Sequence, residues 1–373
     1  MLDGGSHSAC IAMLKTGWPR LWPVLPIVVA LIAVSPHVHA ACVKEIAPSG
    51  VESGLLVHLS ADCTQAEREA HMVRGERIME AIEKGEPVDL AGVLIQGDLL
   101  FDRLTVQTNP KPPTTPERRS LGEQVSNQDQ RRVRAALKIR ESVVLGAFRH
   151  RSATAALRFE GPLDVRNTRF TEGVDLSRSV FQEEVDLSGA TFEKEAHFVQ
   201  GQFAKPVACQ ETKFGPSTRF HRSTFQGSVD CTAALFDGMV EFLEVNFEQP
   251  VTFERSRFGL GTGFSGSRFR SRSSFAEAIF SRETFFMFAA FEGETVFAGA
   301  QFLGPSDFSN AEFRLQDDLA RARFDQAPLL VRTKRLSPVQ SGDLLQTRNG
   351  QYAFTLIVLI VAALLVAYAV KLK

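Results

Sequence analysis

Three aspartates recur at a spacing that could bring their carboxylates together. Asp164 and Asp186 are 22 residues apart, and Asp230 follows after twice that interval. Carboxylates that a fold stacks closely can bind calcium or take part in acid–base catalysis. The alternative is a row of solvated charges beside outward Thr and Ser. We favour this alternative because no nucleophile and no acid–base pair accompanies the three aspartates.

The histidines and the first cysteines offer little further chemistry. Five histidines follow the N-terminal region, and none shows the spacing of a metal site or a catalytic triad, so we expect them on the surface. They are His58, His71, His150, His197 and His221. Cys42 and Cys63 flank the first segment after the N-terminal region and could form a disulfide in an oxidising compartment. We predict no metal site, no cofactor and no catalytic residue.

The first 40 residues have the pattern of a signal peptide. Lys15 and Arg20 precede an apolar run of about fourteen residues, and the small-residue motif at 38–40 suits a cleavage site. The apolar run is too short for a comfortable membrane span. We therefore predict that residues 1–40 direct export and are cleaved.

The C-terminal region predicts a membrane span. Residues 353–370 carry no charge, lie between Tyr352 and Tyr368, and are just long enough to cross a hydrocarbon core. We predict a single-pass protein of the bacterial inner membrane. Its main domain would be periplasmic, and the tail at 371–373 would be cytoplasmic.

Phenylalanine recurs every eleven residues through the centre of the chain. The chain has 30 Phe but only 2 Tyr and 2 Trp, which indicates a dry aromatic core. A second series of mostly Phe, Leu or Cys lies six residues after the first, so steps of five and six alternate. Such steps do not line one face of a helix, whereas a solenoid of short strands accommodates them. The predicted repeat core is Phe170, Phe181, Phe192, Phe203, Phe214, Phe225, Phe236, Phe247, Phe258, Phe269, Phe280, Phe291, Phe302 and Phe313.

The segments "SGATF", "AEAIF", "AGAQF" and "SNAEF" resemble the pentapeptide-repeat family. That resemblance implies an all-β solenoid, wound as a right-handed, four-sided parallel β-helix with one pentapeptide on each face. This chain is a Phe-rich variant with an 11-residue period of five plus six. The extra residue in every second unit predicts 22 residues per coil, with that residue at a corner.

A 22-residue coil would stack Cys209 directly on Cys231 and Asp164 on Asp186. Adjacent strands lie about 4.8 Å apart, which is within disulfide range. Two interpretations of the cysteine pair remain: a disulfide between coils, or two reduced core residues that replace Phe. We favour the reduced pair.

The segments around the repeat complete the predicted architecture. An N-terminal helix would cap the open end of the solenoid: Thr64 and Glu67 form a capping-box motif, and Gly85 with Pro87 ends the helical pattern. The predicted boundaries are 41–87 for the N-terminal segment, 88–105 for early coils, 106–133 for a flexible proline-rich loop, 134–325 for the β-helix and 326–352 for a linker.

One stretch departs from the repeat. In "TFFMFAAF", Phe285 and Phe288 are out of register and should point outward or pack into a corner. Exposed aromatic pairs often mark contacts with other molecules. Arg268, Arg270 and Arg272 lie nearby in the sequence and could surround such a patch.

These features predict a non-enzymatic, membrane-anchored scaffold that binds a protein partner, or a second copy of itself, in the bacterial envelope. The alternative is a β-helix enzyme or binding protein for envelope polysaccharide that uses Asp164, Asp186 and Asp230. Some pentapeptide-repeat proteins mimic DNA, which requires a cytoplasmic and strongly acidic rod. This solenoid carries only about six net negative charges and is predicted to be exported. We therefore predict no nucleic-acid partner.

Overall fold

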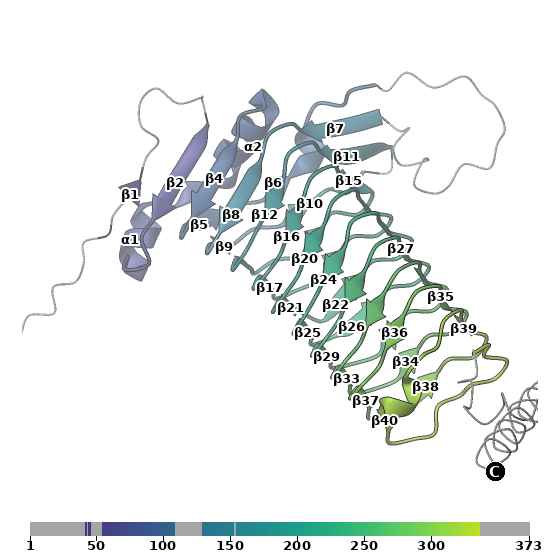
Figure 1. The fold of residues 1–373 in the computed structure, drawn as a ribbon. Helices are drawn as coiled ribbons and strands as arrows, with labels where there is room; N and C mark the ends of the chain where they lie inside the picture. Colours follow the sequence, from purple (N-terminus) through teal and green to yellow (C-terminus); the bar gives the residue numbers. More distant parts are fainter. Residues whose placement is uncertain (1–41, 43, 46–53, 109–128, 153, 336–373) are drawn as a thin grey trace, which may run out of the picture. The chain divides into compact units, whose positions relative to one another are not determined.

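The computed structural model describes residues 42, 44–45, 54–108, 129–152 and 154–335. The predicted signal peptide and membrane span lie outside these residues. The described chain winds into a solenoid whose four sheets hold 11, 11, 9 and 9 strands, here named sheets A, B, C and D in the order in which the chain visits them (Figure 1). No helix within the described ranges is both long enough and apolar enough to span a bilayer.

Each coil adds one short strand to each sheet. Sheet A consists of β1 (Lys44–Glu45), β2 (Leu55–Leu59), β4 (Val88–Ala91), β8 (Leu137–Arg140), β12 (Leu163–Asp164), β16 (Val185–Asp186), β20 (Val207–Ala208), β24 (Val229–Asp230), β28 (Val251–Thr252), β32 (Ser273–Ser274) and β36 (Thr295–Val296). Sheet B consists of β3 (Val73–Arg74), β5 (Leu94–Gln96), β9 (Val143–Val144), β13 (Arg169–Phe170), β17 (Thr191–Phe192), β21 (Lys213–Phe214), β25 (Leu235–Phe236), β29 (Arg257–Phe258), β33 (Ile279–Phe280), β37 (Gln301–Phe302) and β40 (Arg323–Phe324).

The other two sheets begin one strand later. Sheet C consists of β6 (Leu99–Leu100), β10 (Phe148–Arg149), β14 (Val174–Asp175), β18 (Ala196–His197), β22 (Ser217–Arg219), β26 (Met239–Glu241), β30 (Thr262–Gly263), β34 (Thr284–Phe285) and β38 (Ser306–Asp307). Sheet D consists of β7 (Asp129–Val133), β11 (Ala155–Phe159), β15 (Ser179–Phe181), β19 (Gln202–Phe203), β23 (Thr224–Phe225), β27 (Asn246–Phe247), β31 (Arg268–Phe269), β35 (Ala290–Phe291) and β39 (Glu312–Phe313).

The strand register confirms a 22-residue coil. Phe170 pairs with Phe192 in sheet B, and Phe181 pairs with Phe203 in sheet D, both in parallel. Each residue therefore lies directly beside the residue one coil later. The fold agrees with the four-sided parallel solenoid that the repeat predicted.

The core is a set of stacked phenylalanine columns. All fourteen predicted core phenylalanines are buried, with at most 3% of their surface exposed. The rings of Phe236 and Phe258 stack with centroids 4.9 Å apart and planes 2° apart. Phe236 also meets Phe242 of the neighbouring column edge-on, at 6.0 Å and 81°. Phe236 thus stacks along its own column and packs edge-to-face across the core, both of which are favourable aromatic geometries.

The five-residue steps turn through tight corners. In one such corner the N–H of Ala234 donates to the carbonyl of Cys231 at 3.1 Å, and Ala233 between them has a φ of 58°. The same arrangement closes the turn from Phe286 to Ala289, where Phe288 has a φ of 58°. A left-handed residue at the third position is the signature of a type II turn. Most of these positions carry residues other than Gly, so the corners are strained.

The N-terminal segment contains two helices where we predicted one. Helix α1 spans Gln65–Ala70 and α2 spans Gly75–Lys84. They are separated because Val73–Arg74 forms β3, which pairs in parallel with Ile95–Gln96 of β5. Pairing with the next coil outweighs the helical preference of this short segment.

The predicted helix signals and the predicted cap are present. Thr64 and Glu67 form the capping box, and Gly85 ends α2 in a left-handed conformation with a φ of 76°. Ile78 and Ile82 are buried in the core, and α2 contacts β6, the first strand of sheet C. Helix α2 therefore covers the N-terminal edge of that sheet (Figure 1).

The solenoid extends beyond two of the predicted boundaries. Residues 129–133 form β7 and pair with β11, so the predicted loop at 106–133 ends before them. At the other end, Leu329 pairs with Asp307 and Lys334 pairs with Glu312. Residues 326–335 thus continue the coil, where we predicted the start of a linker.

Truncation of a stacked ring should destabilise the protein far more than truncation of an outward side chain. Phe242 is 2% exposed and stacks on both Phe220 and Phe264. We expect Phe242→Ala to lower the free energy of unfolding by about 3–5 kcal/mol in chemical denaturation. Met239→Ala, at a position 49% exposed in the same coil, should change it by less than about 0.5 kcal/mol. Equal losses from the two variants would refute the register.

Corner strain predicts opposite effects for one substitution at two adjacent alanines. Ala233 is exposed and left-handed, whereas Ala234 is 1% exposed. We expect Ala233→Gly to raise the free energy of unfolding by about 0.5–1 kcal/mol, because glycine adopts positive φ without a steric cost. Ala234→Gly should lower it by about 1 kcal/mol. A loss of stability in both variants, measured by chemical denaturation, would contradict the assigned corner.

Candidate functional site

The three predicted aspartates do form a column along sheet A. Asp164 lies beside Asp186, and Asp186 and Asp230 lie on either side of Ala208. The register thus confirms the predicted stacking. Ala208 interrupts the column between the second and third carboxylates.

Neighbouring cations and donors engage each carboxylate. Arg166 approaches Asp164 at 2.9 Å and Asp186 at 3.3 Å. Asp230 accepts hydrogen bonds from the side chain of Gln210 at 2.8 Å and from the N–H of Thr232 at 2.9 Å. Each of the three carboxylates is therefore ion-paired or hydrogen-bonded within the fold.

The aspartates also have a structural role that recurs through the repeat. Asp186 accepts the N–H of Ser188 at 3.0 Å, and Asp175 accepts the N–H of Ser177 at 3.1 Å. This contact to the residue two positions ahead is an Asx turn, which stabilises a bend in the chain. The repeated "VDLS" motif thus places two inward apolar residues around an aspartate that caps the corner.

The polar contacts continue toward the N-terminus. His58 lies 2.8 Å from Asp89, and Arg140 donates to the same carboxylate at 2.5 Å. Burial raises the pKa of Asp89, but the hydrogen bonds from His58 and Arg140 outweigh this effect and lower the pKa below its usual value. Sheet A therefore carries a ladder of ion pairs and hydrogen bonds across several coils.

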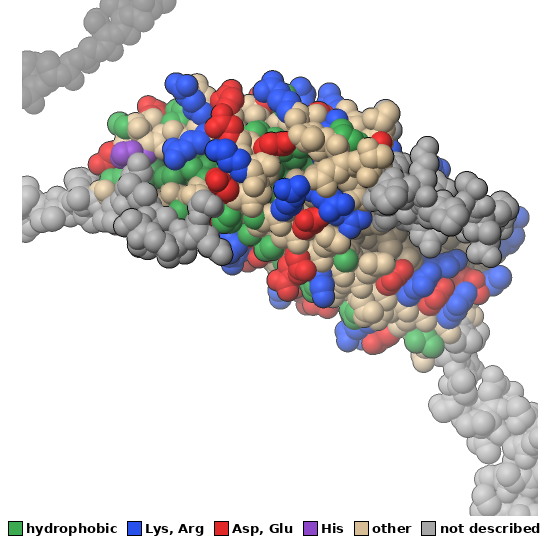
Figure 2. Space-filling view, turned by 90° about the horizontal axis from the view of Figure 1, so that it is seen from above, with side chains coloured by type: hydrophobic (Ala, Val, Ile, Leu, Met, Phe, Trp, Pro, Cys, Tyr) green, Lys and Arg blue, Asp and Glu red, His purple; other side chains and the backbone are tan. Residues whose placement is uncertain are grey.

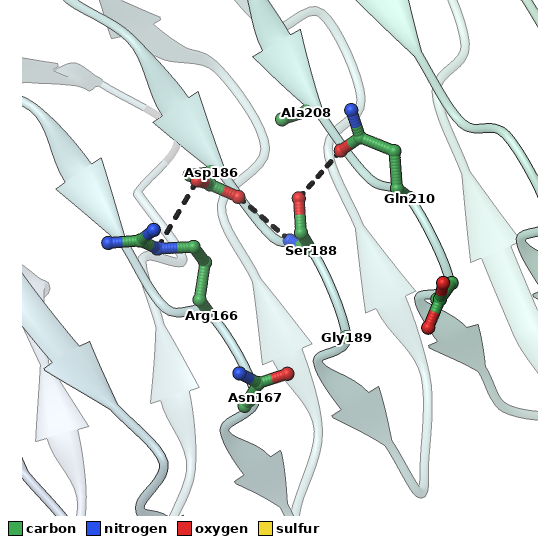
Figure 3. A pocket seen from close by; sticks show the side chains of 8 residues that line it. Arg166, Asn167, Asp186, Ser188, Gly189, Ala208 and Gln210 are labelled. Carbon is green, nitrogen blue, oxygen red and sulfur yellow. Dashed lines mark hydrogen bonds and ion pairs between the residues drawn. The ribbon is translucent and has the colours of Figure 1, made fainter.

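A depression of about 420 Å³ opens on sheet A beside Ala208 (Figure 3). Its lining residues are Arg166, Asn167, Asp186, Ser188, Gly189, Ala208, Gln210 and Glu211. Figure 3 shows their contacts: Arg166 reaches Asp186, and Ser188 donates to the side-chain oxygen of Gln210 at 2.7 Å. The surface could hydrogen-bond a polar ligand. Within the described ranges, no group of three or more His, Cys, Asp or Glu side chains could hold a metal ion.

Phe285 and Phe288 point outward. Phe285 ends β34 on sheet C and is 38% exposed, and Phe288 lies in the following turn and is 64% exposed. The preceding coil offers no side chain to cover them, since Gly263 pairs with Phe285 and Gly266 lies 22 residues before Phe288. The exposure of both rings favours the outward orientation over corner packing.

The three arginines do not surround this aromatic pair. Arg268 lies on β31 of sheet D and approaches Glu292 at 3.6 Å. Arg270 and Arg272 follow β31 and lead into β32 of sheet A, so they belong to the far corner of sheet D. The candidate site that remains is the pair Phe285 and Phe288, here called the aromatic pair.

The structure corrects the prediction for one histidine. His150 is 1% exposed, and its Nε2 atom lies 3.9 Å from the Asp102 carboxylate. Neither ring nitrogen has a hydrogen-bond partner among the described residues. Burial lowers the pKa of His150, and the nearby Asp102 opposes this effect only in part. His150 occupies an inward position, because Arg149 pairs with Asp175 and His150 therefore lies one coil before the buried Leu176. Sequence reasoning missed this because the coil is 26 residues long here, which places His150 outside the 22-residue register.

Both cysteine pairs form disulfides. Cys42 pairs with Cys63 as predicted, and Cys209 pairs with Cys231, in place of the reduced pair that we favoured. The Cα atoms of each pair are 4.5 Å apart. In-register stacking at the strand spacing brings Cys209 and Cys231 into bonding range. Two disulfides are typical of an extracytoplasmic domain.

The chain matches no protein-family model, no characterised protein and no solved structure. Its four-sided parallel coils of 22 residues and its stacked Phe columns are consistent with a pentapeptide-repeat-like solenoid. This likeness concerns the fold. The fold alone does not specify a function, which depends on the side chains exposed at the surface.

Burial of His150 predicts a loss of stability in mild acid. Its pKa in the folded protein is below the ordinary value of about 6.5, so below that pH the unfolded chain binds a proton that the folded chain does not. We expect the free energy of unfolding to fall as the pH decreases below about 6.5 toward the folded-state pKa. His150→Asn should reduce this slope in denaturation curves measured across the range. An unchanged slope in His150→Asn would contradict the assignment.

Proposed function

We propose that this protein is a non-enzymatic scaffold, anchored in the bacterial inner membrane, whose periplasmic solenoid binds a protein partner through the aromatic pair. The observation that carries the proposal is the exposure of Phe285 and Phe288. All other described phenylalanines are buried, except Phe324, which is half-buried.

The energetics favour a binding role for the aromatic pair. Fully burying one Phe side chain contributes about 2–3 kcal/mol, and Phe288, which is 64% exposed, makes only part of this contribution within the fold. Phe288 also has a φ of 58°, which costs a side chain other than glycine about 1–2 kcal/mol. The same left-handed conformation occurs at other corners, for example at Ala233, so the apolar exposure of Phe288 is the feature that favours a binding surface.

The scaffold limits the entropic cost of such binding. Phe285 belongs to a strand that is paired on both sides, with β30 and with β38. The N–H of Phe288 donates to the carbonyl of Ser309 at 3.0 Å. Because the backbone is held in place, a partner would meet the rings with little loss of chain entropy.

The proposed compartment is supported by the two disulfides and by the predicted signal peptide. The surface charge also disfavours a nucleic-acid partner. Figure 2 shows Lys and Arg side chains interspersed with Asp and Glu on the face in view, with no broad block of one sign. Binding to a phosphate backbone relies on clustered basic residues.

The alternative remains an enzyme or binding protein for envelope polysaccharide. It would use Asp164, Asp186 and Asp230. The depression beside Ala208 is the observation in its favour. The geometry gives it less support, because Arg166 and Gln210 engage the carboxylates.

Photo-crosslinking in intact cells tests the proposal. A photoreactive amino acid at position 285 or 288 should give one discrete protein adduct, because the partner covers these rings. Met239 is the matched control, since it is an apolar residue on the same sheet and is 49% exposed. Adducts of equal yield from all three positions, or none from 285 and 288, would count against the aromatic pair as a binding site.

A second variant separates binding from folding. We expect Phe288→Gly to raise the free energy of unfolding by about 1 kcal/mol, because it removes a left-handed aromatic residue from the surface. The same variant should abolish the adduct formed from position 285. A loss of stability together with the adduct would indicate a structural role for Phe288.

A further inference from the structure

Exposed apolar side chains are concentrated toward the C-terminal end of the solenoid. Eleven large hydrophobic residues of the described chain are strongly exposed, and seven of them lie between positions 285 and 331. These seven are Phe285, Phe288, Leu303, Leu315, Leu329, Leu330 and Val331. The N-terminal edge of sheet C, by contrast, is covered by α2.

Three of the seven are consecutive and form part of the last described coil. Leu329, Leu330 and Val331 are 56%, 38% and 55% exposed. The preceding coil holds their backbone firmly: the N–H of Phe308 donates to the carbonyl of Leu329, and the N–H of Asn310 donates to that of Val331, both at 2.8 Å. This is a rigid apolar surface.

Leu330 shows why this surface is apolar. It lies 22 residues after Phe308, which lies 22 residues after Phe286, so it continues an inward column. Among the described residues no further coil follows to cover it. Within the described residues, part of the apolar core is therefore uncovered at this end.

Basic residues follow the apolar triplet directly. Residues 314–335 make up one coil and carry six basic and three acidic side chains, a net charge of +3 in a chain whose total is -1. Arg335 is paired with Asp317 at 2.8 Å, whereas Arg332 bonds to the neutral side chain of Asn310. Arg332 and Lys334 are exposed and keep their charge available.

We propose that this segment, residues 329–335, docks the C-terminal end of the solenoid on the surface of a bilayer that contains anionic phospholipid. The leucines and Val331 would enter the interfacial region, and Arg332 with Lys334 would contact the lipid phosphates. Apolar burial combined with basic residues is how proteins bind membrane interfaces, and each cation near an anionic surface contributes about 1 kcal/mol.

The inference rests on the membrane anchor of the proposed function. Residues 336–352 separate this segment from the predicted span at 353–370, and seventeen residues reach at most about 60 Å. A tether of this length keeps the segment near the bilayer, so a weak interfacial affinity is sufficient.

Docking also limits which kind of protein could cover the aromatic pair. Phe285 precedes Leu329 by 44 residues, which is two coils, or about 10 Å along the sheet. The aromatic pair would then lie close to the membrane surface. A partner that covers it would itself be a membrane protein or a membrane-bound protein.

Tryptophan fluorescence of the full chain in lipid vesicles tests the docking. We expect the fluorescence of Leu330→Trp to be quenched several-fold more by lipids brominated on their acyl chains than that of Leu145→Trp. Leu145 is the matched control because it is 42% exposed and lies in an early coil. Val331→Trp serves as a second probe should Leu330→Trp misfold. Trp18 and Trp22 precede the predicted cleavage site and contribute equally to every variant.

A comparison of phosphatidylcholine vesicles with and without phosphatidylglycerol measures how much the anionic lipid strengthens the docking. Quenching should be stronger with phosphatidylglycerol, and Arg332→Gln combined with Lys334→Gln should remove that increase. Quenching at position 330 no greater than at position 145 in either lipid would overturn the inference. Protection of the indole at position 330 by a second copy, seen as a crosslinked dimer without lipid quenching, would also overturn it.

Extraction with alkaline carbonate tests the predicted membrane span separately from the docking of residues 329–335. If the Leu330→Trp chain resists extraction but its fluorescence stays unquenched, the membrane span is supported and the docking is refuted. If the chain is extracted but phosphatidylglycerol vesicles quench the probe at position 330, the docking is supported and the membrane span is refuted. A chain that is extracted and unquenched refutes both.

Discussion

The rest of the structure depends on the match between the spacing of stacked Phe rings and the spacing of hydrogen-bonded strands. Phe280 and Phe302 stack at 4.6 Å, and Phe242 and Phe264 stack at 4.9 Å, close to the strand separation of about 4.8 Å. A column of identical rings can therefore follow the backbone ladder without distortion. Where a coil is longer, as in the 26-residue step from Phe148 to Val174, the strands still pair in register.

That constraint decides the chemistry of the outer surface. Because the inward positions are committed to packing, the polar residues between them serve the corners and the contacts between coils. The aspartates of sheet A cap turns and pair with Arg166 and Gln210. The Cys209–Cys231 disulfide follows from the same register. These features stabilise the solenoid, which is why a column of carboxylates does not by itself indicate catalysis.

The positions that depart from the repeat are therefore the ones that bear on function. Phe285 and Phe288 add aromatic bulk where the fold gains nothing from it, and Leu330 continues an inward column that no described coil covers. Both features lie toward the same end of the solenoid. A tethered protein that rests this end on the bilayer would present the aromatic pair beside the membrane, which joins the two proposals into one arrangement.

The amino-acid sequence by itself determined the coil length and the inward columns, because a strict period constrains every coil at once. Local signals such as the capping box at Thr64 were also sufficient. The tertiary structure decided what depends on contacts between distant residues. Pairing with β5 divides the expected helix at Val73–Arg74, pairing of β10 with β14 turns His150 inward, and the stacking of adjacent coils joins Cys209 to Cys231. Whether Phe285 points outward or into a corner also depended on its neighbours one coil away, and Gly263 leaves it exposed.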